Sequence, residues 1–324
     1  MYLRANSTFY RLSLPALNLA SLLFKTISFV NLSMKARRQK HFPDLFIISV
    51  DSLSFGGTGK TPLVMAIGRA LEKRSLAFAI ISRGYRSAYE KKGARVEPTH
   101  TVAEVGDEPW LFKKHFPNQD VIIGRDRLRS MAMATARKNR FIIMDDGLQT
   151  SQVRKDFSIM LVNPGHPYFY LRHFKFMMQR ENMVLQYRGR EQQAHKVLPG
   201  TYAFSGEGFW DVGNNRVDVG AARMIAFSAL GDNERFKHDM AHYQLAAFRN
   251  FPDHHTFTAA DIHALEALRR EKGASWMVCT EKDFCKLNTL LEPATPLIYF
   301  QNKIELPDNA IEDIIKHAAE KGFL

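Results

Sequence analysis

The chain has 324 residues, of which 45% are hydrophobic and 24% charged, and these proportions exclude a disordered protein. Its length suits two domains of ordinary size. The formal net charge of +12 favours an anionic partner, either a nucleic acid or an anionic membrane surface.

An amphipathic helix is predicted near the N-terminus, from Leu12 to Met34. Its polar residues recur at intervals of three and four, in one narrow stripe beside a broad apolar face. They are Asn18, Ser21, Lys25 and Ser28. A basic run at residues 35–40 follows the apolar stretch, whereas a secretory signal carries its charge before it. Pro15, Asn18 and Lys25 disfavour a membrane span. We therefore expect an interfacial helix, in which each basic residue adds about 1 kcal/mol at an anionic surface; the alternative is a helix packed on its own domain.

A glycine-rich loop follows a buried strand predicted at residues 45–50. It fits the phosphate-binding pattern G-x-x-x-x-G-K-[ST], with a serine in place of the first glycine. Its residues are Ser54, Phe55, Gly56, Gly57, Thr58, Gly59, Lys60 and Thr61. Backbone N–H groups of such a loop, and the start of the helix after it, bind phosphate oxygens. Lys60 would neutralise phosphate charge and the Thr61 hydroxyl would ligate Mg²⁺. The loop predicts an ATP or GTP site.

Strands and helices alternate after this loop, which predicts an α/β fold with a parallel sheet covered on both faces. Helices are expected at 62–74, 110–116 and 126–139, and strands at 77–82, 121–124, 141–144 and 157–162. Residues 163–222 break this pattern and are interpreted as loops plus a β connector. A second, smaller α/β unit follows, with strands at 224–230, 244–248 and 275–279 and a helix at 259–272. The predicted parts are 1–40 (membrane-associated helix and basic segment), 41–205 (P-loop domain), 206–222 (β connector) and 223–324 (smaller α/β domain).

Charged residues follow several of these strands, at the sheet edge where open α/β folds bind ligands. Asp145 and Asp146 end the strand at 141–144, where P-loop enzymes hold Mg²⁺ directly or through water; a strand-to-turn signal is the alternative. Arg83 follows the strand at 77–82. Asp107 precedes a helix and is a candidate base for a hydroxyl acceptor, or else a helix cap.

The histidines and cysteines fit no metal pattern. His254 follows a strand of the second domain and is a candidate partner for Asp107. His238 and His242 have helical spacing, but with His254 and His255 they match no known zinc site. Cys279 and Cys285 are interpreted as free thiols.

Taken together, these segments resemble the lipid A 4′-kinase, or tetraacyldisaccharide 4′-kinase, family. The motifs that match occur in the family's order and spread over most of the chain. They are Gly-Gly-Thr-Gly-Lys-Thr-Pro at 56–62, Ser-Arg-Gly-Tyr at 82–85, Gly-Asp-Glu-Pro at 106–109, Asp-Asp-Gly-Leu-Gln at 145–149, Phe-Pro-Asp-His at 251–254 and Thr-Glu-Lys-Asp at 280–283.

The resemblance implies a fold, an activity and a location. A membrane-associated N-terminal helix would precede a P-loop kinase domain and a smaller α/β domain. The enzyme would transfer the γ-phosphoryl group of ATP, with Mg²⁺, to the 4′-hydroxyl of a tetraacylated glucosamine disaccharide 1-phosphate in lipid A biosynthesis. Its partners would be this lipid and an anionic membrane surface, at the cytoplasmic face of the inner membrane, with no nucleic acid and no obligate protein partner.

The resemblance also implies residue roles. Asp107 would be the catalytic base and His254 its partner. Lys60 and Thr61 would be the phosphate and Mg²⁺ groups, and Asp145 and Asp146 the acidic pair. Arg83, Arg180 and Glu181 are the substrate-side candidates.

Three positions depart from the family pattern. Residues 50–54 read Val-Asp-Ser-Leu-Ser, where the family usually has Val-Gly-Asn-Leu and a small residue. His255 stands where an aromatic residue is more usual. The family's Leu-Pro-Ala-Gly-Pro-Leu-Arg-Glu-Pro segment is echoed only by residues 179–182, so the substrate-side loop is rebuilt. An alternative function is that of a metabolic or metallochaperone-type P-loop ATPase or GTPase with a non-lipid substrate; a basic adaptor would have no use for the acidic pair.

Overall fold

The chain folds into two compact units. The computed structural model describes residues 8–54, 57–148, 150–166, 171–188, 199–253, 255–287, 290–291 and 295–324. Unit 1 contains residues 1–203 and 304–324, and unit 2 contains residues 204–303.

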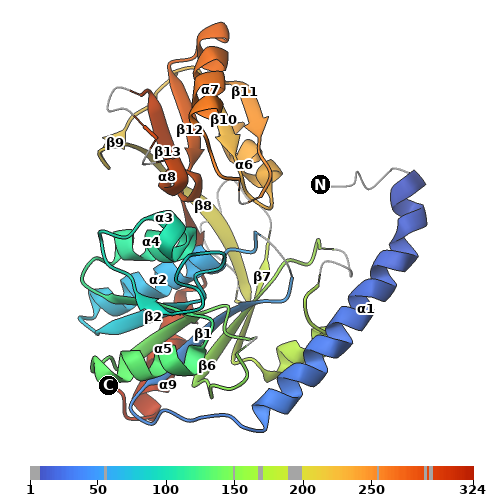
Figure 1. The fold of residues 1–324 in the computed structure, drawn as a ribbon, viewed down its shortest axis with the longest axis vertical. Helices are drawn as coiled ribbons and strands as arrows, with labels where there is room; N and C mark the ends of the chain where they lie inside the picture. The colour runs from blue at the N-terminus through green and yellow to red at the C-terminus, as the bar shows by residue number, and fades with distance from the viewer. Residues whose placement is uncertain are drawn as a thin grey trace. The chain divides into compact units, whose positions relative to one another are not determined.

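A parallel sheet forms the centre of unit 1 (Figure 1). Its strand order is β7-β6-β1-β5-β2-β4-β3, with only β3 antiparallel to its neighbour. The strands are β1 (Phe46–Ser52), β2 (Phe78–Ser82), β3 (Ala94–Arg95), β4 (Asp120–Ile123), β5 (Phe141–Asp145), β6 (Phe157–Val162) and β7 (Met183–Tyr187). Every residue of β1, β2, β4 and β5 is buried, as expected for strands covered on both faces. The predicted α/β fold is therefore confirmed.

Helices cover the two faces of this sheet because successive strand residues point to opposite sides. They are α2 (Lys60–Lys73), α3 (Val102–Val105), α4 (Asp107–His115), α5 (Arg127–Ala136) and α9 (Asp308–Glu320). Ile47 belongs to a buried cluster that includes Met131 of α5. The neighbouring Phe46 ring instead lies 6.2 Å from His317 and 5.6 Å from Phe323, at the C-terminal end of the chain.

The C-terminal helix α9 belongs to unit 1, whereas the sequence analysis grouped it with the smaller domain. Lys321 Nζ lies 2.7 Å from Asp156 Oδ1, and the other oxygen of Asp156 accepts a hydrogen bond from Ile47 N at 3.0 Å. Arg74 of α2 pairs with Glu312 of α9. The predicted range 223–324 is corrected for this reason: local patterning identifies a helix but not the sheet that it packs on.

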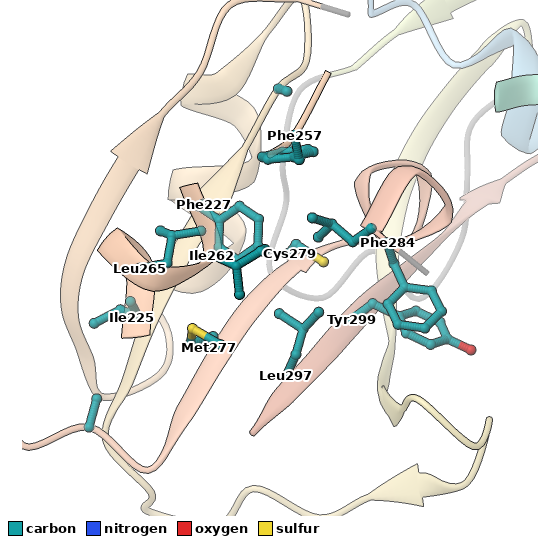
Figure 2. Close-up of a cluster of buried hydrophobic side chains, with 13 residues drawn as sticks. Ile225, Phe227, Phe257, Ile262, Leu265, Met277, Cys279, Phe284, Leu297 and Tyr299 are labelled. Carbon is teal, nitrogen blue, oxygen red and sulfur yellow. The ribbon is translucent and has the colours of Figure 1, made fainter. Parts of the chain in front are cut away.

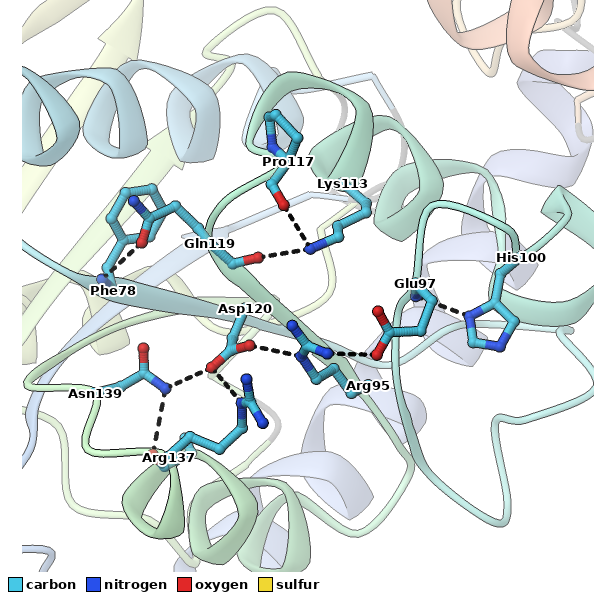
Figure 3. A network of polar contacts seen from close by, with 11 residues as sticks. Phe78, Arg95, Glu97, His100, Lys113, Pro117, Gln119, Asp120, Arg137 and Asn139 are labelled. Atoms are coloured by element: carbon cyan, nitrogen blue, oxygen red, sulfur yellow. Dashed lines mark hydrogen bonds and ion pairs between the residues drawn. The ribbon is translucent and has the colours of Figure 1, made fainter.

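A polar network joins the edge strands of the same sheet at the start of β4 (Figure 3). Asp120 accepts hydrogen bonds from Arg95 and Arg137, both at 2.7 Å, and from Asn139 at 2.9 Å. Burial raises the pKa of Asp120, but these donors outweigh burial and hold the pKa below its usual range. The network lies at the amino end of β4, away from the carboxyl ends of the strands, so we assign it a structural role.

The segment at 163–222 contains more regular structure than predicted. A 3₁₀ helix, Lys175–Arg180, precedes β7, which pairs in parallel with β6. The strand β8 (Thr201–Asp211) starts beside β7 in unit 1 and pairs with β9 (Arg216–Val217) in unit 2, so the predicted connector at 206–222 begins too late. β7 escaped prediction because only Leu185 among its five residues is fully buried.

The N-terminal helix α1 (Thr8–Ala36) packs on unit 1 through part of its surface. Phe29 lies 6.2 Å from Phe174 and 5.4 Å from Phe176, between ring centroids. The polar residues Ser21 and Lys25 are buried, so part of the predicted polar stripe faces the protein. Large apolar side chains are exposed instead, at Leu19, Leu22, Leu23, Phe24, Ile27, Val30 and Met34. Residues 14–36 are long and apolar enough to cross a membrane, by length and composition alone.

Unit 2 is a second parallel α/β layer. Its parallel strands are β10 (Met224–Ser228), β11 (Leu245–Asn250), β12 (Trp276–Thr280) and β13 (Leu297–Glu305), in the order β11-β10-β12-β13. Its helices are α6 (Asn233–Met240), α7 (Ala259–Glu271) and α8 (Glu281–Leu287). One face of the sheet forms the core drawn in Figure 2, where Phe227, Phe257 and Leu265 pack together with Met277 and Leu297.

Candidate active site

The glycine-rich loop joins β1 to α2, as predicted. Gly59 has φ 94°, a left-handed conformation that favours glycine, and α2 begins at Lys60. Tyr202, which is 1% exposed, donates a hydrogen bond from its hydroxyl to the Thr58 carbonyl at 2.8 Å. The loop backbone is thus held from β8. Phe55 and Gly56 lie outside the described residues, so their predicted phosphate contacts stay predictions.

Asp145 is the last residue of β5 and lies opposite Val50 of β1. Its Oδ2 accepts a hydrogen bond from Ser82 Oγ at 2.9 Å. Burial, and next the charge of Glu108, raise the pKa of Asp145 to about 7. Its buried Oδ1 has no hydrogen-bond partner among the described residues.

Asp146 is bound by two cations. Arg172 donates to both of its oxygens, at 2.9 and 3.0 Å, and Lys60 Nζ lies 3.7 Å from Oδ1. Burial raises the pKa of Asp146, but Lys60 and then Arg172 outweigh burial and hold it well below its usual range. Asp146 is therefore an ionised carboxylate that positions the lysine of the loop.

Arg172 was missed by the sequence analysis. It lies in the segment where the family motif is rebuilt, and its backbone N–H donates to the Leu53 carbonyl at 2.8 Å. Residues that meet only through this long-range pairing leave no periodic signal in the sequence. The one hint in the sequence is the abundance of basic and aromatic residues at 168–176.

Asp107 is the first residue of α4, after Gly106, whose φ is 94°. Its Oδ1 accepts a hydrogen bond from Glu108 N at 3.0 Å. Glu108 in turn accepts from Thr61 Oγ1 at 3.1 Å, so the first turn of α4 meets the first turn of α2. The helix N-terminus favours an ionised carboxylate at Asp107. Asp107 is thus linked to the loop through its neighbour Glu108, which contacts Thr61. The role of Asp107 as a base stays a prediction.

The residues at this edge fit a divalent cation of the Mg²⁺ type. Such ions take oxygen ligands and keep several waters and phosphate oxygens, so they need few protein ligands. The unpartnered Oδ1 of Asp145 supplies one such oxygen, and the Thr61 hydroxyl is a second candidate. No group of three or more His, Cys, Asp or Glu able to hold a metal occurs in the described part of the chain.

The substrate-side candidates lie in two places. Arg83 donates from Nε to Glu90 at 2.7 Å, and its guanidinium lies 5.4 Å from the centre of the Tyr85 ring. Glu181 lines a cavity of about 250 Å³, whose wall includes Phe29 and Leu32 of α1 and the charged Lys155. Burial raises the pKa of Glu181. The Arg180 side chain and the whole of His254 lie outside the described residues.

Asp51 stands where the family pattern has glycine, and it is fully buried. Its oxygens accept hydrogen bonds from Ser49 Oγ and from Leu148 N, just after the acidic pair. Burial, as the largest cause, raises the pKa of Asp51. Asp51 thus ties β1 to the turn that carries Asp145 and Asp146.

The motif at 280–283 has a structural explanation in unit 2. Asp283 is fully buried, and its Oδ2 accepts hydrogen bonds from Ala229 N at 3.0 Å and from Thr280 Oγ1 at 2.8 Å. Lys286 Nζ lies 3.2 Å from its other oxygen. These contacts fix the start of α8 against the end of β10. Within the described part of the chain Cys279 and Cys285 form no disulfide, in agreement with their interpretation as thiols, and both are buried.

Comparisons with known proteins agree on one family. The family model described as tetraacyldisaccharide-1-P 4′-kinase matches residues 14–320. The chain is 32% identical over 263 residues to a tetraacyldisaccharide 4′-kinase of Methylobacterium nodulans, covering 74% of each chain. It is 30% identical over 292 residues to one of Koribacter versatilis, covering 83% of this chain and 88% of that protein. The crystal structure of "apo" form LpxK from Aquifex aeolicus in complex with ATP is similar with a TM-score of 0.73 and 25% identity, covering 95% of this chain and 98% of that one.

Proposed function

The chain belongs to the tetraacyldisaccharide-1-P 4′-kinase family, and on this premise we propose that it is the ATP-dependent kinase of a lipid A precursor. It transfers the γ-phosphoryl group of ATP to the 4′-hydroxyl of a tetraacylated glucosamine disaccharide 1-phosphate. One observation carries the proposal: in a chain that matches the family over residues 14–320, Lys60 of the loop lies 3.7 Å from Asp146 at the carboxyl edge of the parallel sheet.

Phosphoryl transfer depends on positioning and on charge stabilisation more than on covalent chemistry. Backbone N–H groups of the loop hold the phosphates, and Lys60, kept in place by Asp146, faces their negative charge. The Asp146–Arg172 fork stabilises that arrangement. Mg²⁺, when bound, neutralises charge on the β- and γ-phosphates, and Thr61 and Asp145 are the residues that would hold it.

Asp107 is proposed as the base. It takes the proton of the 4′-hydroxyl while that oxygen bonds to the γ-phosphorus and the bond to the β–γ bridging oxygen breaks, which releases ADP. Placement at the first turn of α4, next to Glu108 and its contact with Thr61, supports this role. His254 is proposed as its partner from the family resemblance.

Asp107→Ala should lower the rate severely and spare ATP affinity. Adding His254→Ala should lower the rate scarcely further, because residues that act as a unit lose rate non-additively. Fully multiplicative losses would contradict the pairing.

Membrane attachment is proposed to be peripheral, at the cytoplasmic face of the inner membrane. The acceptor is an acylated lipid, and the exposed apolar side chains of α1 offer a surface for the acyl–headgroup boundary. Lys35, Arg37, Arg38 and Lys40 follow at the end of this helix and would attract anionic lipid.

The test is transfer of label from γ-labelled ATP with the tetraacylated disaccharide 1-phosphate, with a non-lipid disaccharide, or with no acceptor. The proposal expects label in the lipid and little release without it. Release of labelled phosphate at the same rate in all three reactions would instead identify an ATPase with another substrate. Lys60→Ala serves as the negative control.

A further inference from the structure

We propose that His166 and Asn163 are positioning residues that direct the Ser54 hydroxyl proton toward a phosphate oxygen of the bound nucleotide. This inference rests on the proposed function, since it presumes that the loop binds a nucleotide. It adds two residues that no motif of the chain identified, and it explains why the first position of the loop carries a hydroxyl.

Three side chains form a chain of hydrogen bonds that ends at the loop. His166 Nδ1 lies 2.7 Å from Ser54 Oγ, and His166 Nε2 lies 3.1 Å from Asn163 Nδ2. The carbonyl oxygen of the Asn163 side chain accepts from Gly165 N at 3.0 Å. The distances are those of good hydrogen bonds.

The order of donors fixes the imidazole tautomer. Since Gly165 N–H can only donate, the Asn163 oxygen faces it, and the Asn163 amide nitrogen faces His166. An amide NH₂ group can only donate, so His166 Nε2 is the acceptor. In the neutral ring Nδ1 therefore carries the proton and donates it to Ser54 Oγ.

Ser54 is then left with its own proton to donate. A hydroxyl has one donor hydrogen and two lone pairs, and His166 occupies a lone pair. Among the described residues none accepts from Ser54 Oγ, although Ser54 is only 1% exposed. Ser54 is the first position of the phosphate-binding pattern, six residues before Lys60, so an anionic oxygen is the acceptor that the loop itself brings.

The backbone keeps this segment against the loop. Ser54 forms an antiparallel bridge with Leu171, and Arg172 N donates to the Leu53 carbonyl at 2.8 Å. The Arg172 guanidinium donates to both carboxylate oxygens of Asp146. The same returning segment thus reaches the phosphate loop at Ser54 and the acidic pair at Asp146.

The test measures affinity for Mg·ATP and for ADP by calorimetry, without the lipid acceptor, in the full chain. Ser54→Ala and His166→Phe should each weaken binding about 10- to 150-fold, the effect of losing one hydrogen bond to a charged group. His166→Asn, whose amide N–H lies near the position of Nδ1, should stay within about threefold of the wild type. The double variant should be no worse than Ser54→Ala. His263→Phe, at an exposed histidine of α7, is the matched control and should change nothing.

Asn163→Asp adds a readout that a merely structural role would not move. The new carboxylate at position 163 can only accept, so the neutral His166 ring must carry its proton on Nε2. Nδ1 then becomes an acceptor. The Ser54 hydroxyl donates to Nδ1 and no longer to the phosphate. At neutral pH the affinity of this variant should therefore fall. The imidazolium that forms in acid donates from both nitrogens, so the affinity should return toward that of the wild type there. Adding Ser54→Ala should abolish this pH dependence.

The outcomes separate the two proposals. A wild type that binds no nucleotide would overturn the proposed function together with this inference. A wild type that binds Mg·ATP, with unchanged affinity in Ser54→Ala or His166→Phe, overturns the inference alone. Multiplicative losses in the double variant, or a pH dependence of Asn163→Asp that persists without the Ser54 hydroxyl, also overturn it. If His166→Phe lowers the unfolding temperature, His166→Asn and Asn163→Asp carry the test.

Discussion

Replacing Arg172 tests whether the segment that departs from the family pattern holds Asp146 in place. Arg172 is 8% exposed, and its two hydrogen bonds to Asp146, at 2.9 and 3.0 Å, form a bidentate fork. Breaking a buried ion pair costs about 3–5 kcal/mol, but Lys60 stays as a second cation, so we expect about 2–3 kcal/mol for Arg172→Ala. In a chain of this size that corresponds to a fall of roughly 5 °C in unfolding temperature.

The functional effect should exceed the stability effect. Without the fork, Lys60 is the one cation among the described residues that still forms an ion pair with Asp146, and the lysine charge is drawn from the phosphates to the carboxylate. We expect phosphoryl transfer to fall about 10²-fold, with weaker Mg·ATP binding. Arg172→Lys restores the charge but not the planar fork, so it should recover part of the loss.

Kinase rates, Mg·ATP affinity and thermal unfolding of both variants check this reasoning. Arg74→Ala is the matched control, because its ion pair with Glu312 is exposed and such pairs contribute about 0–1 kcal/mol. An Arg172→Ala enzyme with wild-type affinity and rate would refute the role given to the fork. So would a loss equal to that of Arg74→Ala.

Further predictions concern the loop, a buried histidine and the N-terminal helix. Lys60→Ala should lower phosphoryl transfer by about 10²-fold or more, and near-normal turnover would remove the loop from the mechanism. His173 is 2% exposed, and burial, then Arg172, lower its pKa to about 4. The histidine in the unfolded chain takes up a proton near pH 6.5, whereas the folded chain does so only near pH 4, so the wild type should lose stability as pH falls from 6.5 to 4. The loss relative to His173→Gln should reach about 3 kcal/mol. Chemical denaturation of both proteins across this pH range measures the loss, and a stability difference that does not change with pH would contradict the prediction. Deleting residues 1–34 should leave a folded, ATP-binding core that binds anionic vesicles weakly in sedimentation, whereas full sedimentation at high salt would place the anchor elsewhere.

Local patterns in the sequence were enough for the parallel sheet of unit 1. The strands at 45–50, 77–82 and 141–144 are apolar except for Ser49 and Ser82, because both faces of the sheet are covered. Asp145 was found at the end of β5 because P-loop enzymes hold Mg²⁺ through a carboxylate that follows such a strand. β7 and the placement of α9 were not predictable in this way, since each depends on which distant element it packs against.

The residues of the site also differ in whether the sequence could identify them. Lys60, Thr61 and Asp107 lie in short contiguous motifs that a reader of the sequence can recognise. Tyr202 and His166 reach the loop, and Arg172 reaches the residue before it, from more than 100 residues away in the chain. No spacing rule links these residues to the loop. Such contacts are visible only once β7 and β8 extend the sheet and the segment before them returns across the loop.

The position of the transferred phosphate tests the central claim most directly. The wild-type enzyme is incubated with Mg·ATP and the tetraacylated glucosamine disaccharide 1-phosphate, and the lipid product is analysed by mass spectrometry and phosphorus NMR. The account predicts a single added phosphate on the 4′-oxygen, formed with one ADP per product and absent with Lys60→Ala. Phosphate on any other hydroxyl, or ADP formed with no change in the lipid, would contradict it.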